Sequence, residues 1–246
     1  AIKISCDFGE NGLVRMRGGD WNDAMDKVGE KGIGTTVWCT MFLYHVIERF
    51  LPYVKDIELC DELRRIGKAL YGAVCDSYED DRFLRAYADD GTALGSKESK
   101  ACKIDILTQS WSVIAGIGSA EQKKTALDSA YNLLCNGENK LIRLFDPPFT
   151  SSDGVGYIGD YPRFVRENGG QYTQAAVWYV WALFQNGQTE RANELLKWLN
   201  PANRCKTESD AEDYCVEPYV SAADVYGGEL AGKGGWTWYT GSAAWL

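Results

Sequence analysis

Histidine is almost absent from this sequence of 246 residues, in which His45 is the only one. The eight cysteines are scattered, and no two of them form a Cys-x-x-Cys pair. Zinc sites need closely spaced ligands of these two types, so we expect no metal site. His45 lies in an apolar helical stretch, and we interpret it as a packed core histidine without a catalytic role.

Long hydrophobic runs and basic clusters are missing as well. The apolar segment 175–184, "AAVWYVWALF", is about half the roughly 20 residues that a membrane-spanning helix needs. The net charge is -9, and the sequence contains no block of consecutive lysines or arginines. Both features argue against a nucleic-acid partner. We expect neither a membrane segment nor nucleic-acid binding.

The N-terminal segment "AIKISCDFGENG" has neither the basic head nor the apolar middle of a signal peptide. Several cysteines lie among apolar residues in helical patterns, where cysteine behaves as a small hydrophobic residue. These features favour a reducing compartment, and we expect a cytoplasmic location. Because no initiator methionine is present, we also expect a chain that is processed or cut from a longer one.

Two kinds of helical pattern alternate along the chain. Three segments are apolar almost all round, as buried helices are, and each is followed by a segment with one apolar face. The buried segments are 36–50, 105–117 and 173–185, and the one-sided segments are 57–75, 121–135 and 189–199. The only strand that we expect is a short one in 12–16, "GLVRM".

Three such pairs in succession predict inner and outer helices arranged as hairpins, which is the construction of an all-α toroid. We therefore predict an (α/α)6-barrel type of fold, with residues 1–246 as a single domain. A closed double ring usually needs about twice as many hairpins, so the chain is expected to be only part of a barrel.

The motif "RGGDWNDAM", residues 17–25, carries the first candidate site. The indole of Trp21 can cover the C–H face of a sugar ring, and Asn22 and Asp23 can reach its hydroxyls or the glycosidic oxygen. A carboxyl beside an indole has the low-polarity surroundings that favour its protonated form, so Asp23 is the candidate general acid. An Asx turn that caps a helix is the alternative interpretation of the same residues.

The motif "YPRFVRENGGQYTQAA", residues 161–176, leads into a buried helix. Glu167, Asn168 and Gln171 precede the helix N-terminus, where free backbone N–H groups favour an anion or a ligand rich in hydroxyls. A helix cap is the alternative interpretation. In "GKGGWTWYTGSAAWL", residues 232–246, Thr240 and Gly241 open another predicted helix, which is either a small anion pocket or an ordinary N-cap.

Four motifs, taken in order, resemble a known family. "GDWNDAMDKVGEKGIGTTVW", "RENGGQYTQAAVW", "VEPYVSAADVY" and "GGWTWYTGSAAW" are similar to the catalytic domain of inverting glycoside phosphorylases, which include the cellobiose and chitobiose phosphorylases. The sequences of these motifs are most similar to the branch that acts on β-1,2-glucans, including 1,2-β-oligoglucan phosphorylase and the C-terminal domain of cyclic β-1,2-glucan synthases. The resemblance runs from about Leu13 to the end of the chain and implies the C-terminal part of the catalytic barrel.

The resemblance implies a role for several residues. Asp23 matches the general acid, Trp21 the aromatic residue beside it, and Glu167 an acid that holds substrate hydroxyls. Thr240 and Gly241 match the phosphate binders. Gln174 stands where the family carries a phosphate-binding histidine, and glutamine can donate a hydrogen bond but cannot become a cation.

The expected reaction is phosphorolysis of a β-linked glucan or gluco-oligosaccharide with inversion, which yields α-glucose 1-phosphate. Inorganic phosphate would be the co-substrate, and no further cofactor is expected. The family's upstream half supplies an arginine and an aspartate, so a segment or partner chain would complete the barrel; a homo-oligomer is also possible. An inverting hydrolase and a catalytically silent carbohydrate-binding fragment are the alternatives.

Overall fold

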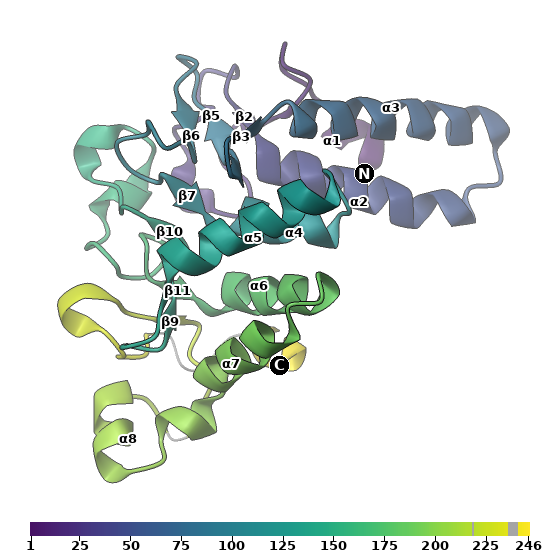
Figure 1. The fold of residues 1–246 in the computed structure, drawn as a ribbon. Coiled ribbons are helices and arrows are strands. Elements are labelled where there is room, and N and C mark those ends of the chain that lie inside the picture. Colours follow the sequence, from purple (N-terminus) through teal and green to yellow (C-terminus); the bar gives the residue numbers. More distant parts are fainter. Residues whose placement is uncertain (218, 236–240) are drawn as a thin grey trace.

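Three helical hairpins form the body of the protein in the computed structural model, which describes residues 1–217, 219–235 and 241–246 (Figure 1). The first helix of each hairpin is an inner helix: α2 (Val37–Phe50), α4 (Ile106–Ile114) and α6 (Thr173–Gln185). The second is an outer helix: α3 (Ile57–Cys75), α5 (Ala120–Leu134) and α7 (Thr189–Leu199). Two short helices, α1 (Ile2–Ser5) and α8 (Glu208–Tyr214), lie outside the hairpins.

The hairpins stack side by side in chain order (Figure 1). Helix α4 packs between α2 and α6, and each outer helix packs on the inner helix of its own hairpin. The helix-rich architecture and the three inner-plus-outer pairs are thus confirmed. Closure of the ring into an (α/α)6 barrel stays a prediction.

Polar side chains determine where most of these helices begin. Thr36 accepts a hydrogen bond from the third backbone N–H of α2, over 3.2 Å, and Asp105 accepts one at the start of α4, over 2.7 Å. A reciprocal capping box of Ser119 and Gln122 opens α5. Each of these caps satisfies backbone donors that the helix itself leaves unpaired. Helix α6 begins at Thr173 without a side-chain cap.

Short strands are more numerous than the sequence suggests. The expected strand in 12–16 is present as β1, but eleven further two-residue strands accompany it within the described ranges. A strand of two residues shows no alternation of polar and apolar positions, which explains why the pattern misses it. The strands are β1 (Val14–Arg15), β2 (Thr35–Thr36), β3 (Tyr78–Glu79), β4 (Arg82–Phe83), β5 (Ala86–Tyr87), β6 (Ala93–Leu94), β7 (Ile104–Asp105), β8 (Cys135–Asn136), β9 (Leu141–Ile142), β10 (Phe145–Asp146), β11 (Gln171–Tyr172) and β12 (Asp224–Val225).

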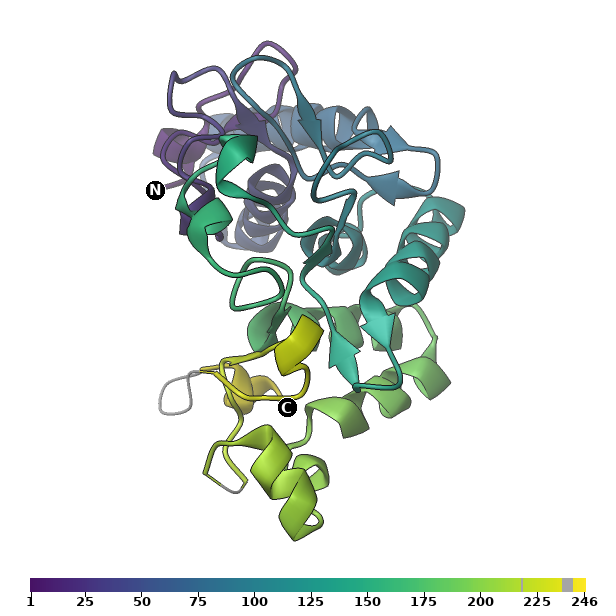
Figure 2. The ribbon, with the colours of Figure 1, turned by 90° about the vertical axis from the view of Figure 1, so that its left-hand side faces the viewer.

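One of these strands directly precedes every inner helix: β2 comes before α2, β7 before α4 and β11 before α6. All three strands have antiparallel partners, in the four-stranded sheet β1-β2-β5-β6 and in the pairs β10-β7 and β11-β12. The strands and their loops therefore gather at the N-terminal ends of the inner helices, and Figure 2 looks onto this face. Figure 1 shows the same face at its left edge.

The inner helices meet through one tryptophan each. Trp38 of α2, Trp111 of α4 and Trp178 of α6 are buried, with ring centroids 5.2 to 6.3 Å apart. Trp111 stands edge-on to both of the other rings, a geometry that aromatic pairs favour. The ring of His45 lies 5.8 Å from that of Trp111, and burial lowers the pKa of His45. His45 thus contributes to the packing of α2 against α4.

The eight cysteines are free thiols. Within the described ranges, no helix combines the length and the apolar character that crossing a membrane requires.

Candidate active site

A buried ion-pair cluster anchors the loop that carries the "GDWND" motif. The guanidinium of Arg85 donates two hydrogen bonds of 2.7 Å to the carboxylate of Asp20, and its Nε lies 3.1 Å from Asp105. All three side chains are at most 1% exposed. Burial raises the pKa of Asp20, but the charge and hydrogen bonds of Arg85 outweigh it and keep that pKa below its ordinary value. Burial dominates at Asp105 and raises its pKa to about 6.

The two residues after Trp21 have different surroundings. Asn22 is 2% exposed, and its side-chain oxygen accepts a hydrogen bond of 3.2 Å from the backbone N–H of Ala24. It thereby caps the 3-10 helix η1 (Asp23–Met25), which is the alternative interpretation of this motif. Asp23 follows it directly and is exposed. The buried side chain of Asn22 therefore stabilises the turn, whereas Asp23 lies on the surface of the turn.

Trp21 joins this loop to helix α6. Its indole Nε1 donates a hydrogen bond of 3.3 Å to Oε1 of Gln174, in the first turn of the helix. Its ring stands edge-on to Tyr172 at 5.2 Å and lies 6.1 Å from Trp178. Two motifs that are 153 residues apart in the chain thus meet at one place.

Glu167 lies close to the same place, in a cluster of acids and phenols. Its side chain is largely buried, and its Oε2 is 3.5 Å from Nε of Arg166. Burial raises the pKa of Glu167, and the negative charges of Asp224 and Asp23 add to the rise while Arg166 opposes it. Burial also raises the pKa of Tyr172 to about 12, with further contributions from Glu167 and Asp224. The carboxyls of Asp23 and Glu167 are therefore electrostatic neighbours.

Asn168 and Gln171 hold the surrounding backbone together. The amide of Asn168 donates to the carbonyls of Phe149 and Tyr161 and accepts from the N–H of Phe149. Oε1 of Gln171 accepts a hydrogen bond of 3.0 Å from the N–H of Ile142. Both side chains are at most 1% exposed. Both side chains thus support the backbone around the site, and their contact with substrate stays a prediction.

The predicted phosphate seat is described only in part. Thr240 lies outside the described residues. Gly241 opens the 3-10 helix η7 (Gly241–Trp245), which packs against α6, the helix that carries Gln174. The rings of Trp245 and Trp181 meet there at 5.5 Å.

Several residues at the site were missed by the sequence-based interpretation. Tyr172, Arg166 and Asp224 all lie within or beside quoted motifs, and Tyr157 contacts Asp23 from a loop without a recognised motif. Strand pairing would have revealed one of them, because Tyr172 is directly opposite Asp224 in the β11-β12 pair. Among the described residues, no three histidine, cysteine, aspartate or glutamate side chains are placed to hold a metal ion.

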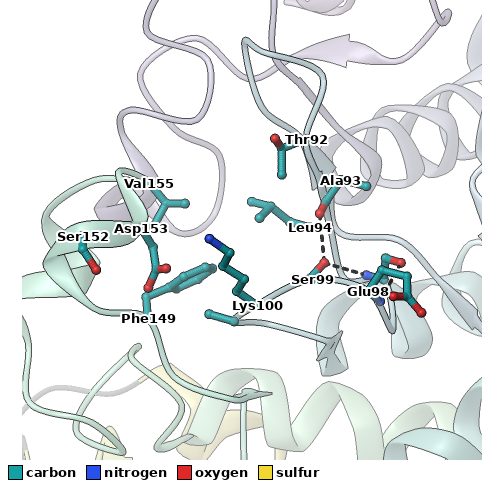
Figure 3. Close-up of a pocket in the computed structure, with 12 residues that line it drawn as sticks. Thr92, Ala93, Leu94, Glu98, Ser99, Lys100, Phe149, Ser152, Asp153 and Val155 are labelled. Atoms are coloured by element: carbon teal, nitrogen blue, oxygen red, sulfur yellow. Dashed lines mark hydrogen bonds between the residues drawn. The ribbon is translucent and has the colours of Figure 1, made fainter.

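A separate cavity of about 450 Å³ lies beside this face, with the side chain of Lys100 extending into it (Figure 3). Asp153 and Val155 form part of its wall, but none of the predicted site residues lines it. The carbonyl of Val155 also accepts a hydrogen bond from the N–H of Lys27, just after η1. The segment around Val155 therefore borders both the cavity and the turn that carries Asp23.

Residues 1–246 match the Glycosyl hydrolase 94 superfamily, catalytic domain, over their whole length. The chain belongs to this family. It is 47% identical over 244 residues to the cyclic beta-(1,2)-glucan synthase NdvB of Rhizobium meliloti (strain 1021), a match that covers 97% of this chain and 9% of the synthase. Solabiose phosphorylase of Paenibacillus borealis is 27% identical, with 100% of this chain and 33% of that protein covered. N,N'-diacetylchitobiose phosphorylase of Vibrio furnissii is 24% identical, and the match covers 100% of this chain and 31% of that protein.

This member of the glycosyl hydrolase 94 superfamily thus spans about a third or less of the length of these relatives. Among solved structures it is similar to a wild-type glycosidase, with a TM-score of 0.54 and 13% sequence identity. The match covers 81% of this chain and 44% of that one, and it supports the helical hairpin fold.

Proposed function

We propose that this chain carries the acid-donating part of a glycoside phosphorylase site that acts on a β-linked glucan or gluco-oligosaccharide. The observation that carries the proposal is the Trp21–Gln174 hydrogen bond, because it brings the acid-bearing turn to the N-terminus of α6. Related proteins with phosphorylase names support the reaction type. The 47% identity to a cyclic β-1,2-glucan synthase favours a β-1,2-linked glucan.

Each role follows from the surroundings of the residue. Asp23 is exposed on its turn and would protonate the interglycosidic oxygen as general acid. The ring of Trp21 would face the sugar, and the carboxylate of Glu167 would accept hydrogen bonds from its hydroxyls. Thr240 and Gly241, with the amide of Gln174, would bind phosphate near a helix start, where backbone N–H groups favour anions.

One catalytic acid is sufficient for this reaction. An inverting hydrolase needs a second carboxylate to deprotonate water, whereas phosphate is already an anion and attacks directly. Attack from the face opposite the leaving sugar converts a β-link into an α-glucose 1-phosphate. The remaining barrel helices, with further phosphate and sugar ligands, would come from another segment or chain. We also propose that the protein works in the cytoplasm.

Hydrolysis with inversion is the second candidate, and one observation favours it. Gln174 is neutral, and its Oε1 is already engaged by Trp21, so it offers phosphate only its amide hydrogens. Glu167, whose pKa is raised, would then serve as the base that activates water. In this case free glucose replaces glucose 1-phosphate as the product.

Incubation of the full-length protein with linear β-1,2-glucan, with and without inorganic phosphate, separates these reactions. The phosphorylase proposal predicts α-glucose 1-phosphate that appears only with phosphate. Free reducing sugar at the same rate without phosphate would support the hydrolase. Binding of the glucan with no product under either condition would support a silent carbohydrate-binding fragment and overturn both.

A further inference from the structure

The turn that carries Asp23 is fastened to one distant segment of the chain. The N–H of Lys27 donates to the carbonyl of Val155 over 3.2 Å, and the N–H of Tyr157 donates to Oδ1 of Asp26, also over 3.2 Å. These two hydrogen bonds hold 155–157 alongside η1 and the residues that follow it. The 3-10 helix η4 (Tyr157–Asp160) begins at this point and packs against η1.

Gly156 makes the contact between the two segments especially close. Its φ is +131°, and a Cβ atom built on it would lie 2.3 Å from Oδ1 of Asp26 and 2.4 Å from the carbonyl oxygen of Ala24. No side chain fits at these distances, so the backbone at 156 touches the acid-bearing turn directly. The position of the following residue, Tyr157, is therefore fixed relative to Asp23.

The phenol of Tyr157 reaches the carboxylate of Asp23. Burial raises the pKa of Tyr157 to about 12, and the charge of Asp23 and a hydrogen bond to it contribute, followed by Tyr161 and Glu167. The phenol therefore keeps its proton at working pH and acts as a donor. The ring stands edge-on to Tyr161 at 5.9 Å and is 39% exposed, so it borders solvent on the side of Asp23.

We propose that Tyr157 is a positioning residue for Asp23, whose phenol binds one carboxyl oxygen and thereby leaves the catalytic proton on the other. This inference rests on the proposed role of Asp23 as general acid. A carboxylate has two equivalent oxygens, either of which can take up the proton, and only one of them can face the glycosidic oxygen. A fixed donor on the first oxygen selects the second one for the proton, which is the orientation that general-acid catalysis needs.

The first test is Tyr157→Phe in the full-length protein, which removes the hydroxyl and keeps the ring. We expect kcat for the glucan to fall about tenfold, the value of one hydrogen bond to a charged group, with little change in KM. The alkaline limb of the pH profile of kcat should move up by about one pH unit, because the ionised carboxylate loses a donor. Tyr161→Phe, which removes the same atom from the neighbouring ring, is the control and should leave the profile unchanged.

The second test changes the backbone contact. Gly156→Ala should reduce kcat further, because its Cβ displaces the turn that carries Asp23. Gly154→Ala is the matched control, because Gly154 also has positive φ but a Cβ there meets nothing within 4 Å. Both substitutions strain the backbone, Gly156→Ala more than Gly154→Ala because the conformation of Gly156 suits only glycine, so a loss in the first variant alone reports the conformation and the contact of residue 156 together.

Asp23→Asn separates this inference from the proposed function. If Asp23→Asn is inactive while Tyr157→Phe matches the wild type in kcat and pH profile, the acid assignment holds and the positioning role is wrong. If Tyr157→Phe raises only KM, the phenol binds substrate and the positioning role is likewise wrong. If Asp23→Asn retains wild-type activity, the proposed function fails first.

Discussion

The indole Nε1 of Trp21 lies 3.3 Å from Oε1 of Gln174, as donor to acceptor, and 153 residues of chain separate the two. The bond orients Gln174 as well as Trp21. Since the carbonyl end of the amide faces the indole, its N–H groups face away and are available to an anion. Position 174 therefore offers a neutral donor, and the direction of that donor is determined by Trp21, the residue that we propose covers the sugar.

Loss of the indole N–H of Trp21 should weaken phosphate binding more than it lowers the stability of the fold. In Trp21→Phe the aromatic contacts with Tyr172 and Trp178 are retained, but Gln174 loses its orienting bond. We expect KM for phosphate to rise by about threefold to tenfold, which corresponds to one neutral hydrogen bond. Steady-state kinetics at fixed glucan concentration measure this change, and an unaltered KM for phosphate would speak against the orienting role.

Introducing a cation at position 174 should have the opposite effect. In Gln174→His the imidazole can be protonated near its ordinary pKa of about 6.5, which makes its hydrogen bond to phosphate charge-assisted. We expect KM for phosphate to fall at about pH 6 and to approach the wild-type value at about pH 8. Initial rates over a phosphate series at both pH values test this, and a KM that is the same at both would show that position 174 does not contact phosphate.

We expect the ionised carboxylate of Glu167 to bind substrate and at the same time to lower the stability of the folded protein. Its pKa is raised in the folded protein, so protonated Glu167 favours folding, and this contribution is lost as the pH rises above its ordinary pKa. Glu167→Gln should therefore melt at a higher temperature than the wild type at neutral pH, and the difference should vanish at about pH 4. At the same time kcat/KM should fall by about 10-fold to 100-fold, since hydroxyl donors lose a charged acceptor.

Calorimetry across this pH range, paired with kinetics, checks both effects of Glu167→Gln. The exposed Glu138 provides the control, because Glu138→Gln should change neither property. A variant of Glu167 that melts below the wild type at neutral pH would show that the carboxylate is well compensated in the folded state.

Arg85 is expected to be essential for the fold of the acid loop. Replacing it by leucine leaves the carboxylates of Asp20 and Asp105 buried without their cation, a change that typically costs about 3–5 kcal/mol. Arg64→Leu breaks an exposed pair with Asp61 and should cost less than about 1 kcal/mol. Urea unfolding of both variants gives the comparison, and equal losses would contradict the importance of the buried cluster.

The helices could be predicted because their patterns are long. The predicted segments 57–75 and 173–185 coincide with α3 (Ile57–Cys75) and α6 (Thr173–Gln185), each of which contains three or more turns of periodic apolar residues. The small strands could not be predicted, because two residues contain no period. They are formed by pairing between distant segments, as in the pairing of β2 with β5.

The sequence motifs predicted several residues that the structure places together, but they predicted the geometry of the candidate site only in part. Asp23, Trp21 and Glu167 belong to motifs, and the structure brings them together. Asn22 and Asn168 belong to the same motifs but satisfy backbone groups of their own loops, a demand that sequence patterns do not separate from ligand binding. Sequence patterns also missed Arg85 and Tyr157, because their partners Asp20 and Asp26 lie 65 and 131 residues away in the chain.

The central claim is that Asp23 supplies the proton to the leaving sugar, and leaving-group dependence tests it most directly. Asp23→Asn should abolish formation of α-glucose 1-phosphate from β-1,2-glucan and phosphate. The same variant should retain phosphorolysis of an aryl β-glucoside whose leaving group needs no proton, because the phosphate seat and sugar contacts are intact. Equal losses on both substrates, or wild-type activity on the glucan, would contradict the account.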